Sequence, residues 1–170
     1  MGIFDQSSLT KQNPATVLLS GFQVRCTLHS IGMMQTFLND ELKPVLTLHQ
    51  ASVLGLQRGN PATSMLLPEL YVRKDQCHMI AFEQMFSQEE TGLMPRVEAL
   101  AIYTSDYVLQ GKVHLGTEDQ LHDFIVAGKS YFIGMTDVAV FPLFELQTAM
   151  IQQAPLVFVY RNAVRMHHPV

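Results

Sequence analysis

Charged residues are scarce in this sequence. Asp, Glu, Lys and Arg together make up 15% of the 170 residues, and the net charge is -4. The eleven Lys and Arg residues form no cluster, so the basic surface that is typical of nucleic-acid or anionic-membrane binding is missing. No apolar run reaches the roughly 18 residues that a membrane-spanning helix needs, and the N-terminus does not resemble a signal peptide. We expect a soluble, cytoplasmic protein that does not contact a membrane.

Catalytic signatures are missing as well. The chain contains no HExxH or Cys-His cluster that would hold a metal and no GxSxG motif that would present a nucleophilic serine. The glycine-bearing loop at 57–64 lacks the second glycine and the lysine of a phosphate-binding loop. These absences favour a protein without catalytic residues, metal or cofactor. A small-molecule-binding protein, or an enzyme whose site carries no known motif, is a further alternative.

Hydrophobic residues are abundant, at 48%, and their pattern occurs twice. When the chain is laid on itself at an offset of 87, residues 22–80 meet residues 109–167 without a gap. Only nine of these 59 pairs are identical, so the argument depends on the order of structural signals and not on identity. The sequence predicts an internal tandem duplication of one small α+β unit.

Each copy gives the same series of signals. Apolar residues at every second position predict a first strand, and a short helix follows. The apolar stripe of that helix is Met34, Phe37 and Leu38 in the first copy and Leu121, Phe124 and Ile125 in the second. Thr117 and Gln120 have the spacing of a capping box at the helix start. A long strand comes next, which we expect to bend or split near Gln50 or Asp137, and then a hairpin with a tight turn.

These signals give a fold class and a domain organisation. The predicted unit is β-α-β-β, with a further strand possible, and each copy would form a mostly antiparallel sheet or a small barrel with one short helix. We expect a flexible N-terminal arm over residues 1–13, repeat one over 14–80, a connector over 81–98 and repeat two over 99–170. Residues 97–103 would add a hairpin arm to repeat two, and residues 15–19 would be its counterpart.

The aligned copies bear on the cysteines and histidines. Cys26 and Cys77 fall opposite Val113 and Val164, which indicates small apolar core positions where free cysteine is common. The seven histidines form no pair at helical ligand spacing, and those with a counterpart in the other copy are opposite other residue types. We therefore interpret both residue types as structural or surface residues, with no metal site.

The end of each copy carries a family resemblance. The segment Val157 to Met166, an apolar strand, a short basic and polar turn and a second apolar strand, resembles the last two strands of Sm-like proteins, Hfq included. Tyr71 to Cys77 is a shorter version in the first copy. The resemblance implies a small β-barrel and RNA binding at the turns. The residues that it would place there are Arg73, Lys74, Asp75, Tyr160, Arg161 and Asn162.

Two further features are candidates for binding. Asp137 lies at the expected bend of a long strand, where its carboxylate could bind a ligand or hold the amides of the turn. The polar loop at 57–64 has an apolar counterpart in the other copy, which faces the core or forms an interface. The residues assigned to that interface are Phe144, Leu146, Met150 and Ile151.

The function that these observations favour is a non-catalytic assembly or protein-interaction module. We expect a homo-oligomer or a protein partner, because repeated units with exposed strand edges can pair with further chains. An Sm-like RNA-binding protein is the alternative, although the net negative charge disfavours it, since phosphate binding depends on Lys and Arg.

Overall fold

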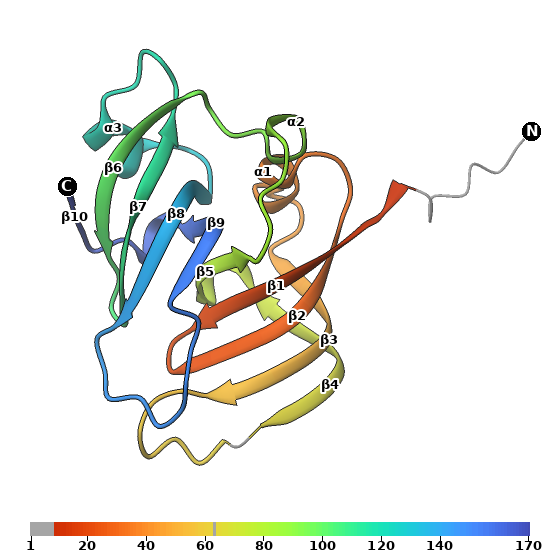
Figure 1. Cartoon of the computed structure of the whole chain (residues 1–170). Helices are drawn as coiled ribbons and strands as arrows, with labels where there is room; N and C mark the ends of the chain where they lie inside the picture. The colour runs from red at the N-terminus through yellow and green to blue at the C-terminus, as the bar shows by residue number, and fades with distance from the viewer. Residues whose placement is uncertain (1–8, 63) are drawn as a thin grey trace, which may run out of the picture.

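The computed structural model describes residues 9–62 and 64–170, which form one open antiparallel sheet (Figure 1). The sheet has ten strands in the order β10-β6-β7-β8-β9-β5-β1-β2-β3-β4. The five strands of the C-terminal half therefore lie side by side, and the five strands of the N-terminal half follow them from β5 to β4. No helix among the described residues is long and apolar enough to cross a membrane.

The first half contains five strands, one helix and one 3₁₀ turn. These are β1 (Lys11–Leu19), β2 (Phe22–Ser30), α1 (Met34–Leu38), β3 (Val45–Gly55), β4 (Met65–Arg73), the 3₁₀ turn η2 (Lys74–Gln76) and β5 (Cys77–Phe82). A helical turn, α2 (Gln88–Thr91), follows in the connector. Ser87 and Glu90 form a reciprocal capping box at the start of α2, and Gly92 ends it in the left-handed conformation with φ 71°.

The second half has the same order of elements. These are β6 (Arg96–Tyr103), β7 (Tyr107–Leu115), α3 (Leu121–Ala127), β8 (Phe132–Pro142), β9 (Gln153–Tyr160), the 3₁₀ turn η3 (Arg161–Ala163) and β10 (Met166–Pro169). The strands predicted from residues 15–19 and 97–103 are present as β1 and β6. The short helix of each half lies between its second and third strands, as the apolar stripes predicted.

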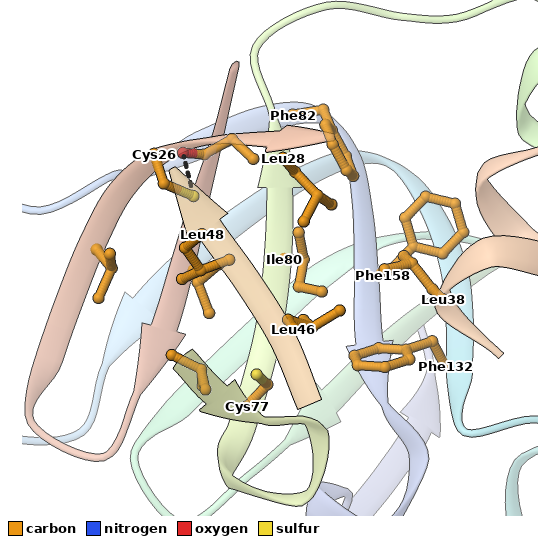
Figure 2. Close-up of a cluster of buried hydrophobic side chains, with 14 of the residues drawn as sticks. Cys26, Leu28, Leu38, Leu46, Leu48, Cys77, Ile80, Phe82, Phe132 and Phe158 are labelled. Carbon is orange, nitrogen blue, oxygen red and sulfur yellow. Dashed lines mark hydrogen bonds between the residues drawn. The ribbon is translucent and has the colours of Figure 1, made fainter. Parts of the chain in front are cut away.

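Each half forms most of one core cluster, and each cluster also takes residues from the other half. Strands alternate their side chains between two faces, and both faces of the central strands β5 and β9 are buried. Ile80 and Phe82 point into the first apolar cluster, where they meet Phe132 and Phe158 of the second half (Figure 2). The neighbouring residues of β5 and β9 belong to a second cluster on the other face. The β5–β9 pairing therefore joins the halves into one packed unit.

The long strands β3 and β8 bend at the same place. Gln50 and Asp137 have positive φ values of 50° and 53°, and they are the only non-glycine residues of the described chain that do. Each lies where the pairing with the preceding strand shifts register, in β2–β3 and in β7–β8. The bend predicted near these two residues is confirmed, and it takes the form of a β-bulge in an otherwise unbroken strand.

The correspondence between the halves contains a gap. From the helix onward, equivalent positions are 87 residues apart: α1 and α3 begin at that offset, and Val45 pairs with Arg73 where Phe132 pairs with Tyr160. The first hairpins correspond at 85 positions, because Lys11 pairs with Ser30 where Arg96 pairs with Leu115. The loop before the helix is longer by two residues in the second half. The gapless alignment is therefore wrong for the first hairpin, and Cys26 is equivalent to Gly111, not to Val113.

The predicted terminal hairpins are also wrong. β4 and β5 do not pair with each other, because β5 pairs with β1 and β9. In the same way β10 pairs with β6 and not with β9. The turns between them are 3₁₀ turns that carry the chain across the curved sheet, and neither Asp75 nor Asn162 has the left-handed backbone of a tight hairpin turn.

Two local expectations need correction. The helix α3 starts later than the Thr117 pattern predicted, with Gln120 as its N-cap and no side-chain cap, and the preceding turn is held by Asp119, which accepts from the amide of Gly116. The predicted N-terminal arm over 1–13 ends earlier, because Lys11 begins β1. Its residues 1–8 lie outside the described part of the chain.

Candidate functional site

A cavity of about 930 Å³ lies on the concave side of the first half. Its apolar wall is formed by side chains that β2, β3 and β4 point inward, including Phe22, Val24, Val53, Leu67 and Leu70. The bent strands curve around it, and it stays open because β4, an edge strand, does not pair with β5. Ligand pockets of proteins fall in the range of roughly 300 to 1,000 Å³ and are mostly apolar with a few polar groups. The cavity matches that description.

Several polar groups of the cavity lie in or next to the two 3₁₀ turns. Arg73 at the end of β4 donates to both carboxylate oxygens of Asp75, and one of these bonds is 3.1 Å long. Tyr160 and Asn162 reach the same cavity from the second half. Burial, followed by the charge of Asp75, raises the pKa of the Tyr160 phenol above its usual range. Four of the residues predicted to bind a ligand, two from each turn, are thus brought together.

The two basic residues of the turns have another role. Lys74 is buried, and its Nζ donates to the carbonyl oxygen of Asp40 at 2.9 Å. Arg161, at the equivalent position, donates to carbonyl oxygens of Phe124, Ile125 and Ser130. Each residue therefore ties its 3₁₀ turn to the segment that contains or follows the helix of the same half, and neither charge faces the cavity.

His78 is a member of the site that the sequence pattern did not reveal. It is 8% exposed, lines the cavity, and its Nδ1 has no hydrogen-bond partner among the described residues. Its Nε2 lies 3.9 Å from Oδ2 of Asp106, and the ring of Tyr107 packs against it edge-on. Desolvation lowers the pKa of the imidazole below its ordinary value of 6.5, more strongly than the carboxylate of Asp106 raises it.

Arg165 also lines the cavity, 87 positions after His78. Its side chain is exposed, and within the described chain its guanidinium makes no hydrogen bond or ion pair. The sequence contains one signal for His78 and Arg165, since both aligned positions carry a side chain with basic nitrogen atoms. That signal does not predict a site by itself, because no sequence pattern indicates that the two positions face one cavity.

The equivalent place in the second half is filled. Tyr107, the counterpart of Phe22, is fully buried and donates its hydroxyl to the carbonyl oxygen of Leu19 at 2.8 Å. Phe144 packs against the Tyr107 ring at 5.6 Å between centroids, and Met150 is buried in the same cluster. The larger aromatic residue and the apolar loop around it thus occupy the space that remains open beside Phe22.

This packing also locates the residues predicted as an interface. Met150 is buried, and Phe144, Leu146 and Ile151 are half-buried against the second core cluster. The segment that contains them pairs with the loop that follows β3, through a bridge between Gln57 and Leu146. These four side chains therefore pack mainly within the chain.

Asp137 and the histidines other than His78 lie away from the cavity. The carboxylate of Asp137 is exposed and pairs with Lys112 at 2.8 Å. Four of the other histidines meet in pairs, His29 stacking on His49 and His122 approaching His167. The remaining two contact other residue types, His114 with Thr136 and His168 with Tyr103. These pairs share no common cleft with His78, and no group of three potential metal ligands occurs among the described residues.

Both cysteines are core residues. Cys26 and Cys77 are buried and unpaired (Figure 2), and burial raises the pKa of each thiol to about 12. A thiol with such a pKa is not a nucleophile at neutral pH.

No family model, no curated protein and no solved structure matches this chain.

Proposed function

We propose that the protein binds a small, largely apolar molecule in the cavity of its first half. One observation carries this proposal, the difference between the two halves at the same position of the fold. The second half fills its concave face with Tyr107 and an apolar loop, whereas the first half leaves an apolar wall uncovered. Interiors are normally packed to high density, so an open space of this size in one of two similar units favours a binding role.

The experiment fills the cavity with a side chain and measures the binding of a neutral apolar dye, Nile red, by fluorescence. Leu67 lines the cavity, and the adjacent Leu66 is 80% exposed, on the other face of β4. We expect Leu67→Trp to weaken dye binding by about tenfold, the equivalent of roughly 1.4 kcal/mol, while Leu66→Trp leaves it unchanged. Equal affinity in both variants, or no binding of the dye to the unmodified chain, would contradict the proposal.

The proposed ancestry is a tandem duplication of a β-β-α-β-β-3₁₀-β unit. Support comes from details that the two halves have in common, beyond the order of elements. The left-handed bulge residues Gln50 and Asp137 are 87 positions apart, and so are the buried bases Lys74 and Arg161. Positive φ at a non-glycine residue and burial of a basic side chain are both uncommon. Their recurrence at the same offset favours a common origin.

A second candidate function is assembly with further copies of the chain. The internal β5–β9 junction pairs the last strand of one half with the fourth strand of the next. The equivalent strands β10 and β4 form the two free edges of the sheet. Pairing of β10 with β4 of another copy would therefore repeat the junction head to tail. The same register would set Met166 opposite Val72 and His168 opposite Leu70.

A cysteine cross-link tests that assembly. We expect His168→Cys combined with Leu70→Cys to form disulfide-linked dimers under mild oxidation, because directly opposed strand residues lie within disulfide range. The matched control is His168→Cys with Leu67→Cys, three residues out of register. Cross-linking that is equal in both pairs, or monomers at all concentrations in sedimentation velocity, would contradict it.

RNA binding of the Sm-like kind stays a prediction, and the charges of the two 3₁₀ turns support it less than the cavity supports ligand binding. Lys74 and Arg161, the basic residues that would contact phosphate, are buried and bonded to backbone carbonyls. Arg73 is paired with Asp75. A gel shift with short mixed RNAs at low salt would decide, because phosphate contacts make affinity strongly dependent on salt.

A further inference from the structure

We infer that the ligand of this cavity carries an anionic head group on its apolar body, and that Arg165 and His78 are the partners of that head group. The inference rests on the proposed function, because it names the class of molecule that the same cavity takes. Its evidence is separate, and comes from the charges and the unpaired polar atoms along one side of the cavity.

The cavity separates apolar from polar groups. Side chains from β2, β3 and β4 supply the apolar wall, while the end of β4, η2, the start of β5 and η3 supply the polar one. An amphipathic molecule fits such a surface in one orientation, with its hydrocarbon part against residues such as Val53 and Leu67. Removal of apolar area from water in this way stabilises the bound molecule.

Among the charged residues that line the cavity, one positive charge is unpaired. Arg73 and Asp75 both line the cavity, but they neutralise each other in a two-bond ion pair. Arg165 has no such partner among the described residues. A guanidinium with free donors beside an apolar cavity is complementary to a carboxylate, since it can donate two parallel hydrogen bonds.

His78 adds an unsatisfied polar atom at the wall of the cavity, because the residue lines the cavity and its buried Nδ1 has no partner among the described residues. A buried polar atom without a partner costs free energy, and such atoms are rare in native structures. Nδ1 of His78 is one of only two buried side-chain nitrogen or oxygen atoms without a partner in the described chain. His78 is close enough to Arg165 for the guanidinium to oppose protonation of the imidazole. A carboxylate between them would accept from Arg165 and, with the imidazole turned toward the cavity, from a protonated Nδ1. It would thereby neutralise the guanidinium and give Nδ1 a partner.

Neutral and charged ligands with hydrocarbon chains of similar length give the test, and decanoate and decanamide also have planar head groups of similar shape. Decanoate, decanamide and decyltrimethylammonium are each used to displace Nile red from the full chain. We expect decanoate to bind about tenfold more tightly than decanamide, as a charge-assisted hydrogen bond allows, and decyltrimethylammonium to bind most weakly. Arg165→Gln should abolish the preference for decanoate and leave decanamide binding unchanged. The matched control is Arg25→Gln, because Arg25 is exposed and does not line the cavity.

The outcomes separate this inference from the proposed function. Equal affinity for decanoate and decanamide, at a site that Leu67→Trp still blocks, overturns the anionic head group and leaves the cavity as a binding site. Failure of all three probes to displace the dye from a site that Leu67→Trp blocks overturns the inference too. An equal effect of Arg25→Gln and Arg165→Gln assigns the preference to net charge and overturns the role of Arg165. His78→Leu is a second variant, and unchanged decanoate affinity there overturns the role of His78.

Discussion

Gln50 and Asp137 adopt the same left-handed backbone at the same point of two different strands. Their φ values are 50° and 53°, and each lies at a bulge next to the preceding strand. Side chains other than glycine are strained in this region, at a cost of roughly 1 to 2 kcal/mol per residue. The strain is retained because the bulge gives both long strands their bend, and the bend of β3 shapes the concave face that holds the cavity.

Replacing either bulge residue by glycine should therefore stabilise the protein. We expect Gln50→Gly to raise the free energy of unfolding by about 1 kcal/mol, and Asp137→Gly by somewhat less, because it also removes an exposed ion pair worth at most about 1 kcal/mol. Chemical denaturation measures both. The control is Ser52→Gly in β3, where φ is not positive and glycine should lower stability by roughly 0.5 to 1 kcal/mol. Destabilisation by Gln50→Gly would show that the left-handed residue is not strained.

Arg161 should contribute strongly to stability. Its guanidinium is buried and satisfies carbonyl oxygens at three residues. Arg161→Leu would leave those oxygens without donors, at an expected cost of about 3 kcal/mol. Lys74→Leu removes a single such bond, so we expect about 1 to 2 kcal/mol. Arg25→Leu, at an exposed position, should change stability by less than about 0.5 kcal/mol, and similar losses in all three variants would contradict the assigned role.

The cysteines should be unreactive in the folded protein. Burial raises the pKa of both Cys26 and Cys77 to about 12, above the ordinary value of 9.0. The thiolate, which is the reactive form, is therefore almost absent at pH 8. We expect no labelling by a thiol-specific disulfide reagent at pH 8 under native conditions, and two equivalents in denaturant. Rapid labelling of the folded chain would mean that one of the two sites opens to solvent.

The elements of this fold could be predicted from the sequence, but their neighbours could not. Apolar alternation locates β3 and β8 closely, because it reports which residues share a face. It does not report which strand lies alongside. β4 and β5 follow each other with only a short turn between them, so a hairpin was the natural interpretation. The pairing of β5 with β1 and β9 depends on long-range packing that no local pattern records.

The candidate site was predictable only in part, for a related reason. Arg73, Asp75, Tyr160 and Asn162 were identified because a turn that carries polar and basic side chains stands out locally. The apolar wall around Leu67 could not be found, since an inward-facing residue looks the same whether its face is covered or open. His78 could not be found either, because its burial and its unpaired nitrogen are properties of the folded chain.

His78 should make the protein less stable in mild acid. Desolvation lowers its pKa below the ordinary 6.5 in the folded state. As the pH falls below 6.5, the unfolded chain therefore takes up a proton that the folded chain does not yet bind, and the free energy of unfolding decreases. We expect lower denaturation midpoints at pH 5.5 than at pH 7.5, and a smaller difference in His78→Gln. A difference of the same size in His78→Gln would assign the effect to other groups.

Neither half should fold alone, even though each has a full set of elements. The first core cluster includes Phe132, Leu156 and Phe158 from the second half, all fully buried. Losing three such side chains, at about 2 kcal/mol each, would remove about 6 kcal/mol, as much as the lower end of the roughly 5 to 15 kcal/mol that stabilises a typical domain. We therefore expect residues 1–93 and 94–170 to lack cooperative unfolding when each is made separately, and to regain it when mixed, as circular dichroism can follow.

The matched control is the full chain cleaved at a protease site inserted after residue 93, which should elute as one complex in gel filtration. Cooperative unfolding of residues 1–93 alone would mean that β5 does not need β9, and that the halves are independent domains that happen to share a sheet.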